Sequence, residues 1–334
     1  MRIVAAVADW TRGRCFPPAV WQKLEGLGAF SWCQEFSKGA NDTGAFIAAI
    51  KDAEILITGW GSPRITAGIL TACPKLKYIA HSAGSVASVD AEAWRRGILV
   101  SNVMPVMALG VSEFTVTCIL NGLRRFDAFV KPERWDSLPF YKVPRVGFML
   151  RERTVGLVGL GIIGRQTLDL LRPFGCRVLV HDPYLAPVDA RQLGVQNVDL
   201  DTLMQSADVV SLHAPGVPAT RHIINRARLA MLKPGAVLVN TARGILIDHD
   251  ALADVAAEGK IGVYLDVTDP EPLPENHRLR HMANVILTPH VAGPTVEGWP
   301  LMGEACVADV ERFVKGEPLA YPVTEAQYAN QSTT

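Results

Sequence analysis

The stretch TVGLVGLGIIGRQ, residues 154–166, decides the fold of this chain. Gly159, Gly161 and Gly164 form GxGxxG between an apolar run typical of a β-strand and a helical pattern. In such a loop the first glycine permits a tight turn, the second lets a pyrophosphate approach the backbone, and the third lets helix and strand pack closely. The phosphate would bind the N–H groups of the first helical turn, at Ile162 and Ile163. Alone, the spacing is equally typical of an ordinary glycine-rich turn.

A carboxylate downstream favours the nucleotide interpretation. Asp182, in HDPY, follows the next apolar run and lies 18 residues after Gly164. A carboxylate at the end of this strand can accept hydrogen bonds from both adenosine ribose hydroxyls and would repel a 2′-phosphate. We therefore expect dinucleotide binding, with NAD preferred over NADP. The alternative for Asp182 is a turn-forming aspartate before Pro183.

Composition restricts the class of protein. The chain has 334 residues, about twice a typical domain, so we expect two domains. Its 33 basic residues equal its 33 acidic ones, which gives no charge signature for nucleic acid or an anionic membrane. Six scattered cysteines show neither CxxC nor metal-ligand spacing, so we expect no metal and a reducing, cytoplasmic environment. We expect no signal peptide and no membrane span.

On both sides of the glycine loop, short apolar runs typical of strands alternate with helical patterns. Before it, apolar runs in RIVAAVA, FSWCQ, EILITG, KYIAHS and GILVSN alternate with helical patterns; after it come RVLVH, DVVSLH, AVLVNT, IGVYLDV and NVILTP. This rhythm predicts an α/β protein with parallel sheets. Long helices are expected over residues 107–130 and from about Thr295 to Lys315. The apolar, proline-rich segment 131–152 is expected to pack against another surface, such as a second subunit.

Five polar residues follow predicted strands in the second half of the chain. They are Asp182, His213, Arg243, Asp266 and His290. Parallel strands end at one edge of their sheet, and open α/β sheets bind ligands at that edge. We therefore expect these five side chains to line one crevice.

The chemistry of these residues points to a dehydrogenase. Arg243 offers a planar fork suited to a carboxylate, and His290 could transfer a proton if Asp269 or Glu271 fixed its tautomer. Alternatively, Arg243 forms a structural ion pair and His290 is a structural histidine. Together with NAD, these residues predict oxidation of an alcohol beside a carboxylate, or the reverse reaction.

Over residues 75–316 the sequence resembles the D-2-hydroxyacid dehydrogenase family, which includes phosphoglycerate dehydrogenase and glyoxylate/hydroxypyruvate reductase. The resemblance rests on GLVGLGIIG, HDPY, DVVSLHAP, LKPGAVLVNTARG, LDV and EPLP…NVILTPHVAG. It implies that Arg243 binds the substrate carboxylate and carbonyl, that His290 is the acid/base and that Glu271 is its partner. It also implies that Asp266 holds the nicotinamide carboxamide. Further residues expected along the cofactor are His213, Pro215, Thr241 and Ala242.

The resemblance also implies two doubly wound domains. A Rossmann NAD-binding domain, residues 105–293, would be inserted into a flavodoxin-like substrate-binding domain, residues 1–104 and 294–334. Gly84 and Ser85 align with a glycine-rich turn that holds the substrate carboxylate, and the helix from Met107 would be the element of a homodimer. Three positions depart from the family pattern: Ser85 replaces a glycine, Met107 stands where many members have Asn, and Thr268 replaces an aromatic residue.

The resemblance also has an implication for the tail of the substrate, the part beyond its carboxylate and carbonyl. It places Trp60 where phosphoglycerate dehydrogenases carry a phosphate-binding arginine, and Met104 and Met107 are expected nearby. This predicts a small or uncharged tail; alternatively, Trp60 packs on the surface and Arg64 supplies the charge. We expect an NAD-dependent enzyme that reduces a 2-oxoacid. The alternatives are an NAD-sensing, corepressor-like interaction protein, a 3-phosphoglycerate dehydrogenase, and formate or phosphite oxidation, which Glu271 disfavours.

Overall fold

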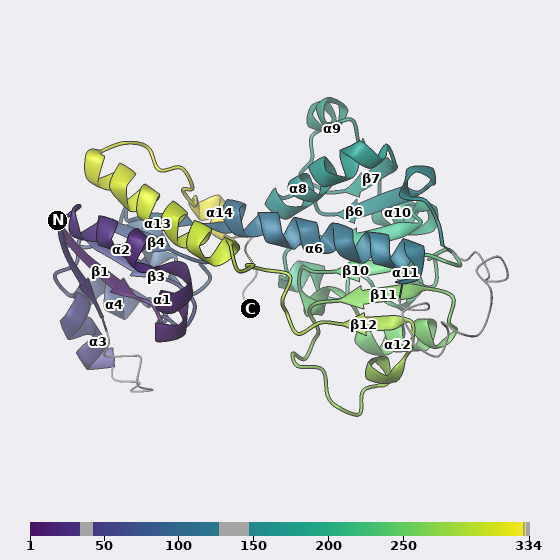
Figure 1. Cartoon of the computed structure of the whole chain (residues 1–334), viewed down its shortest axis with the longest axis horizontal. Helices are drawn as coiled ribbons and strands as arrows, with labels where there is room; N and C mark the ends of the chain where they lie inside the picture. The colour runs from purple at the N-terminus through teal and green to yellow at the C-terminus, as the bar shows by residue number, and fades with distance from the viewer. Residues whose placement is uncertain (34–42, 127–146, 330, 332–334) are drawn as a thin grey trace. The chain divides into compact units, whose positions relative to one another are not determined.

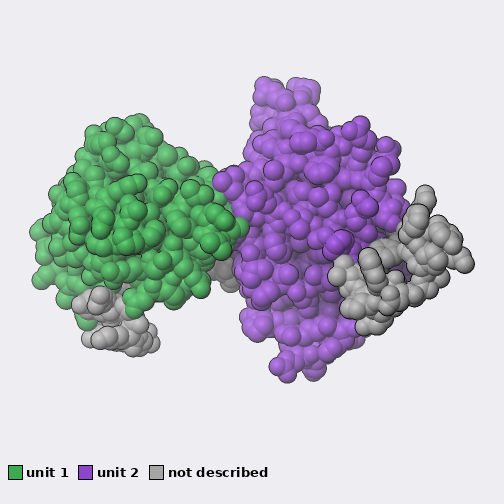
Figure 2. Space-filling view, viewed as in Figure 1, with its two compact units in different colours: residues 1–107, 294–334 green, residues 108–293 purple. Residues whose placement is uncertain are grey.

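The structure of the protein, a computed structural model, describes residues 1–33, 43–126, 147–329 and 331. The chain divides into two compact units, one formed by residues 1–107 and 294–334 and the other by residues 108–293 (Figure 2). The boundaries expected from the sequence, 104/105 and 293/294, lie within three residues of this division. Most of the apolar segment expected to pack against another surface, residues 131–146, lies outside the described part.

Unit 1 is a five-stranded parallel sheet with the strand order β2-β1-β3-β4-β5, the flavodoxin-like order (Figure 1). Its strands are β1 (Arg2–Ala6), β2 (Ala29–Trp32), β3 (Ile55–Thr58), β4 (Tyr78–His81) and β5 (Leu99–Asn102). Its helices are α1 (Asp9–Cys15), α2 (Pro18–Glu25), α3 (Thr43–Ile50), α4 (Ala67–Ala72), α5 (Glu92–Arg95), α13 (Gly298–Lys315) and α14 (Glu325–Ala329). One core cluster joins the sheet to α3, α4 and α5, and another joins it to α1, α2 and α13. Strands buried on both faces explain the continuous apolar runs in the sequence.

Unit 2 is a seven-stranded parallel sheet with the order β12-β11-β10-β9-β6-β7-β8 (Figure 1). Its strands are β6 (Thr154–Val158), β7 (Arg177–His181), β8 (Gln196–Asn197), β9 (Val209–Leu212), β10 (Val237–Asn240), β11 (Gly262–Leu265) and β12 (Val285–Leu287). Its helices are α6 (Met104–Arg124), which begins in the last residues before the boundary, α8 (Ile162–Leu171), α9 (Pro187–Leu193), α10 (Leu200–Ser206), α11 (Arg226–Leu229) and α12 (His249–Ala257). From β8 to β11 this is the Rossmann order, with its reversal between β6 and β9. The predicted fold class, two doubly wound parallel-sheet domains, is confirmed.

Two predicted helix starts are wrong by about one turn. Helix α6 begins at Met104 rather than Met107, since Asn102 Oδ1 accepts the N–H of Met104 (3.2 Å). Helix α13 begins at Gly298 rather than near Thr295, and the Thr295 hydroxyl accepts the N–H of Gly298 (3.0 Å). Side-chain oxygens that accept such N–H groups place residues before a helix instead of inside it.

Helix α6 has the length and apolar character needed to cross a membrane, whereas no stretch of that length was expected from the sequence. Half of its apolar window is buried inside the structure, and Ile119 and Leu123 belong to a core cluster of unit 2. We therefore interpret α6 as a core helix.

Candidate active site

The glycine loop lies at the centre of the unit 2 sheet, where the strand order reverses. Gly159 has φ +97°, and a Cβ there would lie 2.8 Å from the His213 carbonyl carbon. A Cβ on Gly164 would lie 2.5 Å from the Gly159 oxygen. Added atoms at both positions would therefore collide with backbone, as the dinucleotide fingerprint requires.

Space is open at the second glycine of the loop. A Cβ on Gly161 would meet nothing within 4 Å, and this residue precedes α8 without a side-chain cap. Helices α10, α11 and α12, by contrast, each begin with a capping Asp or Asn side chain. The first N–H groups of α8, from Ile162 onward, therefore fit a bound phosphate, which the helix dipole also favours.

Asp182 directly follows β7 and is held against the glycine loop. Its Oδ2 accepts the N–H of Leu160 (2.7 Å), and its Oδ1 accepts the N–H of Tyr184 (2.8 Å). The Asn197 side chain holds the backbone of Asp182: its amide oxygen accepts the Asp182 N–H, and its amide nitrogen donates to the Asp182 carbonyl. No pattern in the sequence pointed to Asn197. Asp182 thus forms a turn and still keeps free lone pairs on both oxygens. Those lone pairs fit the two hydroxyls of an adenosine ribose.

His213 follows β9 next to the glycine loop. Its Nε2 lies 3.0 Å from the Ser211 hydroxyl, while its buried Nδ1 has no partner in the described part of the chain. Burial lowers the pKa of His213 to about 4, so the ring is neutral near neutral pH. A buried polar atom without a partner is costly, and a bound nucleotide could supply that partner. The neighbouring Pro215 is exposed.

Arg243 lies in a turn after β10 that Asn240 organises. The Asn240 side chain accepts the N–H of Ala242 (3.0 Å) and donates to the carbonyl of Arg243 (2.9 Å). Thr241, in the same turn, shares a hydroxyl hydrogen bond with Thr115 of α6 (2.8 Å). Asn240 gave no signal in the sequence beyond its place at the end of the strand.

The stem of Arg243 packs on a glycine. A Cβ on Gly216 would lie 2.8 Å from Arg243 Cγ and 2.9 Å from its Cβ. Burial lowers the pKa of the Arg243 guanidinium, and the negative charge of Glu271 opposes this shift. An arginine remains charged in either case. A half-enclosed guanidinium of this kind is suited to bind a carboxylate.

His290 pairs with Glu271, one of the two carboxylates that the sequence offered. His290 Nδ1 lies 2.5 Å from Glu271 Oε1, and both side chains are about half exposed. Asp269 instead pairs with Arg221 (3.2 Å). Because Glu271 binds Nδ1, the Nε2 of His290 is the ring nitrogen that could exchange a proton with a bound molecule. His290 also has φ +55°, an unfavourable conformation for a non-glycine residue that is typical of functional sites.

Two further residues position this pair. A Cβ on Gly244 would overlap the carbonyl of Thr268, so glycine beside Arg243 lets the loop that carries Glu271 pack closely. Asp266, at the end of β11, binds the loop that carries His290: its carboxylate accepts from the Thr288 hydroxyl (2.6 Å) and from the N–H groups of Val291 (2.8 Å) and Ala292 (2.9 Å). Three of about four acceptor positions of Asp266 are therefore occupied. The predicted contact of Asp266 with the nicotinamide carboxamide stays a prediction for the remaining position.

In unit 1 the expected carboxylate-binding turn follows β4. Asn102 donates to the Gly84 carbonyl (2.7 Å), and a Cβ on Gly84 would collide with the methyl groups of Met107 and Met104. Met104 and Met107, which were expected near Trp60, thus lie against this turn. The Ser85 hydroxyl, which stands where the family has glycine, accepts the N–H of Ala87 (3.3 Å).

His81 supports this turn, and the sequence analysis did not single it out. It is 4% exposed at the end of β4, and its Nδ1 lies 2.9 Å from the Thr58 hydroxyl. Burial lowers its pKa to about 4, which a backbone hydrogen bond with Ser85 partly opposes. The neutral ring thereby joins the ends of β3 and β4.

Trp60 follows β3 at the same edge of the unit 1 sheet. Its carbonyl accepts the Thr11 hydroxyl (3.0 Å). The Ser62 hydroxyl accepts the N–H of Gly59 and donates to the Ala6 carbonyl, which ties the loop after β3 to β1. Arg64 is exposed.

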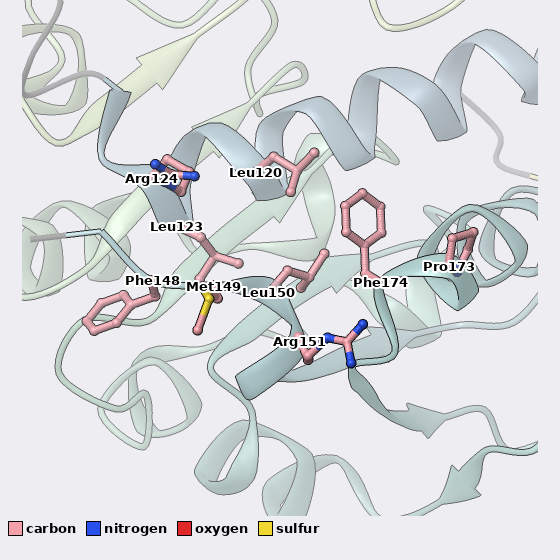
Figure 3. A pocket seen from close by; sticks show the side chains of 9 residues that line it. All are labelled: Leu120, Leu123, Arg124, Phe148, Met149, Leu150, Arg151, Pro173 and Phe174. Atoms are coloured by element: carbon pink, nitrogen blue, oxygen red, sulfur yellow. The ribbon is translucent and has the colours of Figure 1, made fainter.

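A pocket in unit 2 lies apart from these residues. It is lined by the end of α6, the segment before β6 and the turn before β7, including Leu120, Phe148, Phe174 and the two arginines Arg124 and Arg151 (Figure 3). It therefore opens at the amino ends of β6 and β7, whereas the candidate site occupies the carboxyl ends. Within the described ranges, no group of three or more His, Cys, Asp or Glu side chains could hold a metal ion.

The glycine loop fits a dinucleotide, and the same sheet edge carries an arginine suited to bind a carboxylate and a histidine paired with a glutamate. This combination is typical of the class of NAD-binding oxidoreductases. Residues 115–292 match the family model described as the D-isomer specific 2-hydroxyacid dehydrogenase, NAD binding domain. A glyoxylate reductase of Thermofilum pendens is 38% identical over 260 residues, which cover 76% of this chain and 76% of the relative. The chain belongs to the D-isomer specific 2-hydroxyacid dehydrogenase family.

Other relatives and solved structures extend the comparison. A D-3-phosphoglycerate dehydrogenase of Methanocaldococcus jannaschii is 35% identical over 80% of this chain, which spans only 51% of that relative. A D-lactate dehydrogenase from Aquifex aeolicus, complexed with NAD and lactic acid, has TM-score 0.70 and 26% identity, with 95% and 96% of the two chains covered. An acyclic imino acid reductase in complex with NADPH and D-Arg has TM-score 0.78 and 25% identity, with 97% and 100% covered. These relatives differ in substrate and in nucleotide.

Proposed function

We propose that this protein is an NAD-dependent reductase that converts a 2-oxoacid with a small or uncharged tail into a D-2-hydroxyacid. The observation that carries the proposal is the hydrogen bond between His290 and Glu271 at the sheet edge that also holds Arg243. A bound nicotinamide nucleotide would supply the hydride. Every other step is assigned to side chains and N–H groups of this chain.

The guanidinium of Arg243 binds the carboxylate and carbonyl of the substrate. Its positive charge stabilises the negative charge that develops on the carbonyl oxygen during reduction. His290 donates its Nε2 proton to this oxygen, and Glu271 stabilises the imidazolium that must exist before the transfer. In the reverse direction the neutral ring accepts the proton.

The nucleotide preference rests on Asp182. Its free lone pairs suit ribose hydroxyls, and its charge would repel a 2′-phosphate, which supports NAD over NADP. Ile162, Ile163, His213, Pro215, Thr241, Ala242 and Asp266 are proposed to complete the cofactor site. We also propose that the protein is a homodimer in the cytoplasm. Sedimentation of the purified protein tests the dimer, and cell fractionation tests the location.

The substrate class is tested by NADH consumption over a panel of glyoxylate, pyruvate, hydroxypyruvate, phenylpyruvate and 3-phosphohydroxypyruvate. We expect turnover of the unphosphorylated acids and its loss by at least about a hundredfold in Arg243→Ala, since a bidentate charge-assisted contact is removed. Preference for 3-phosphohydroxypyruvate would make the protein a 3-phosphoglycerate dehydrogenase. NADH binding without turnover of any acid would favour the corepressor-like sensor instead.

A further inference from the structure

The unit 1 sheet has its own expected ligand position, at the point where its strand order reverses. Its strand order reverses between β1 and β3, and open α/β sheets bind ligands outside the carboxyl ends of strands at such a reversal. The residues after these two strands include Trp10, in the first turn of α1, and Trp60, two residues beyond β3. The expected ligand position of unit 1 is thus flanked by two indoles.

A third indole completes the group. Trp299, in the first turn of α13, lies 5.1 Å from Trp60 and 6.0 Å from Trp10 between ring centroids, in both cases edge to face. Trp10 and Trp60 are 6.5 Å apart. We call Trp10, Trp60 and Trp299 the tryptophan triad. Three segments far apart in the sequence supply it, and such edge-to-face contacts fix the orientation of the rings.

The triad is incompletely covered. Trp10 is 49% exposed, and Trp60 and Trp299 are only partly buried. The Arg14 guanidinium lies over Trp10 (5.7 Å) and Trp299 (5.4 Å), so it covers faces of these two indoles by cation–π contact. Adjacent aromatic surface left open at the ligand edge of a sheet is suited to another apolar or aromatic group.

The triad lies next to the carboxylate-binding turn. Trp60 follows β3 and the Gly84–Ser85 turn follows β4, and these strands are neighbours about 4.8 Å apart. The loop and the turn are in close contact, since the Ser82 hydroxyl donates to the Thr58 carbonyl (2.9 Å) and a Cβ on Gly59 would collide with that hydroxyl. The methionines over Gly84 add polarisable sulfur, which packs well against aromatic rings.

We propose that the tryptophan triad is the subsite for the side chain of the substrate, and that this side chain is an aromatic ring: the substrate is a 2-oxo-3-arylpropanoate. The inference rests on the proposed function and narrows it. The Gly84–Ser85 turn and Trp60 follow neighbouring parallel strands, so a substrate whose carboxylate binds at this turn can direct a ring one methylene beyond its carbonyl toward Trp60.

The test compares kcat/KM for phenylpyruvate with kcat/KM for glyoxylate. We expect phenylpyruvate to be preferred at least about tenfold, and Trp60→Ala to lower this ratio at least about tenfold, since one lost apolar contact changes specificity by about 10–200-fold. Trp60→Phe should keep most of the preference. The matched control is Trp94→Phe. Trp94 also contacts an aromatic ring, that of Tyr328, but lies in α5, and its substitution should leave the ratio unchanged.

A binding measurement separates this inference from the proposed function. Calorimetric titration with D-phenyllactate in the presence of NADH involves no turnover, and we expect binding that Trp60→Ala weakens and Trp94→Phe does not. Preference for glyoxylate or 3-phosphohydroxypyruvate, or a ratio that Trp60→Ala leaves unchanged, would overturn the aromatic subsite while the reductase stands. If no 2-oxoacid is turned over, the proposed function fails, and absence of D-phenyllactate binding would then overturn the subsite as well.

Discussion

Replacing Glu271 with Gln isolates what the carboxylate contributes to the chemistry of His290. The amide can still accept the hydrogen bond from Nδ1, so the ring orientation is kept, but the negative charge is removed. A charge-assisted hydrogen bond is worth about 1.5–3 kcal/mol, and the half-exposed position of both side chains reduces this to about 1 kcal/mol through solvent screening. Since 1.36 kcal/mol corresponds to one pH unit, the pH at which activity is half-maximal should fall by up to about one unit.

The assay is the pH dependence of kcat/KM in both directions. Reduction needs protonated His290 and declines as pH rises, whereas oxidation needs neutral His290 and declines as pH falls. In Glu271→Gln both limbs should move to lower pH, so reduction at pH 8 falls by up to about tenfold. Asp269→Asn is the control, because Asp269 pairs with Arg221 and should leave both limbs in place. If Asp269→Asn moves the limbs and Glu271→Gln does not, the reasoning is refuted.

Three further perturbations test other parts of the account. We expect the unaltered protein to prefer NAD over NADP by at least about tenfold, because the charge of Asp182 costs a 2′-phosphate roughly 1.4 kcal/mol, and Asp182→Ser should reduce this preference. Equal affinities of the unaltered protein for both nucleotides would contradict this assignment. Gly216→Ala should raise KM for the 2-oxoacid roughly tenfold by displacing the stem of Arg243, whereas Gly13→Ala, where a Cβ meets nothing within 4 Å, should not change KM. His81 is neutral when folded, with a pKa of about 4, so its contribution to stability is complete above pH 6.5 and is lost as pH falls toward 4, by up to about 3 kcal/mol. Urea unfolding at pH 5 and 7.5 should show a smaller difference in His81→Asn, and an unchanged difference would speak against this role.

Much of the site could be predicted because parallel strands end at one edge. The places of Asp182, His213 and Asp266 could be predicted from the positions of the strands that they follow. Those strands were recognisable as runs of apolar residues, which the structure buries on both faces of the sheet. The glycine loop was also predictable, because Gly159 and Gly164 lie too close to backbone atoms for a side chain, while Gly161 leaves open space for a phosphate.

The contacts that could not be predicted from the sequence depend on the paths of loops. Glu271 and Asp269 are two residues apart, and the path of their loop, which packs closely on Gly244, brings Glu271 to His290 and Asp269 to Arg221. The convergence of Trp10 with Trp299 joins the two ends of the chain, and neither residue belongs to a local pattern. The two-residue strand β8 is too short to give a periodic signal.

The most direct test of the central claim follows a labelled hydride. The protein is incubated with NADH deuterated at the transferable C4 position and a 2-oxoacid that it consumes, and the product is examined for deuterium and configuration at C2. The account predicts one deuterium at C2 of a D-2-hydroxyacid, formed at a rate that His290→Gln lowers at least about a hundredfold. A product of L configuration, a C2 without deuterium, or nucleotide binding without consumption of any 2-oxoacid would contradict it.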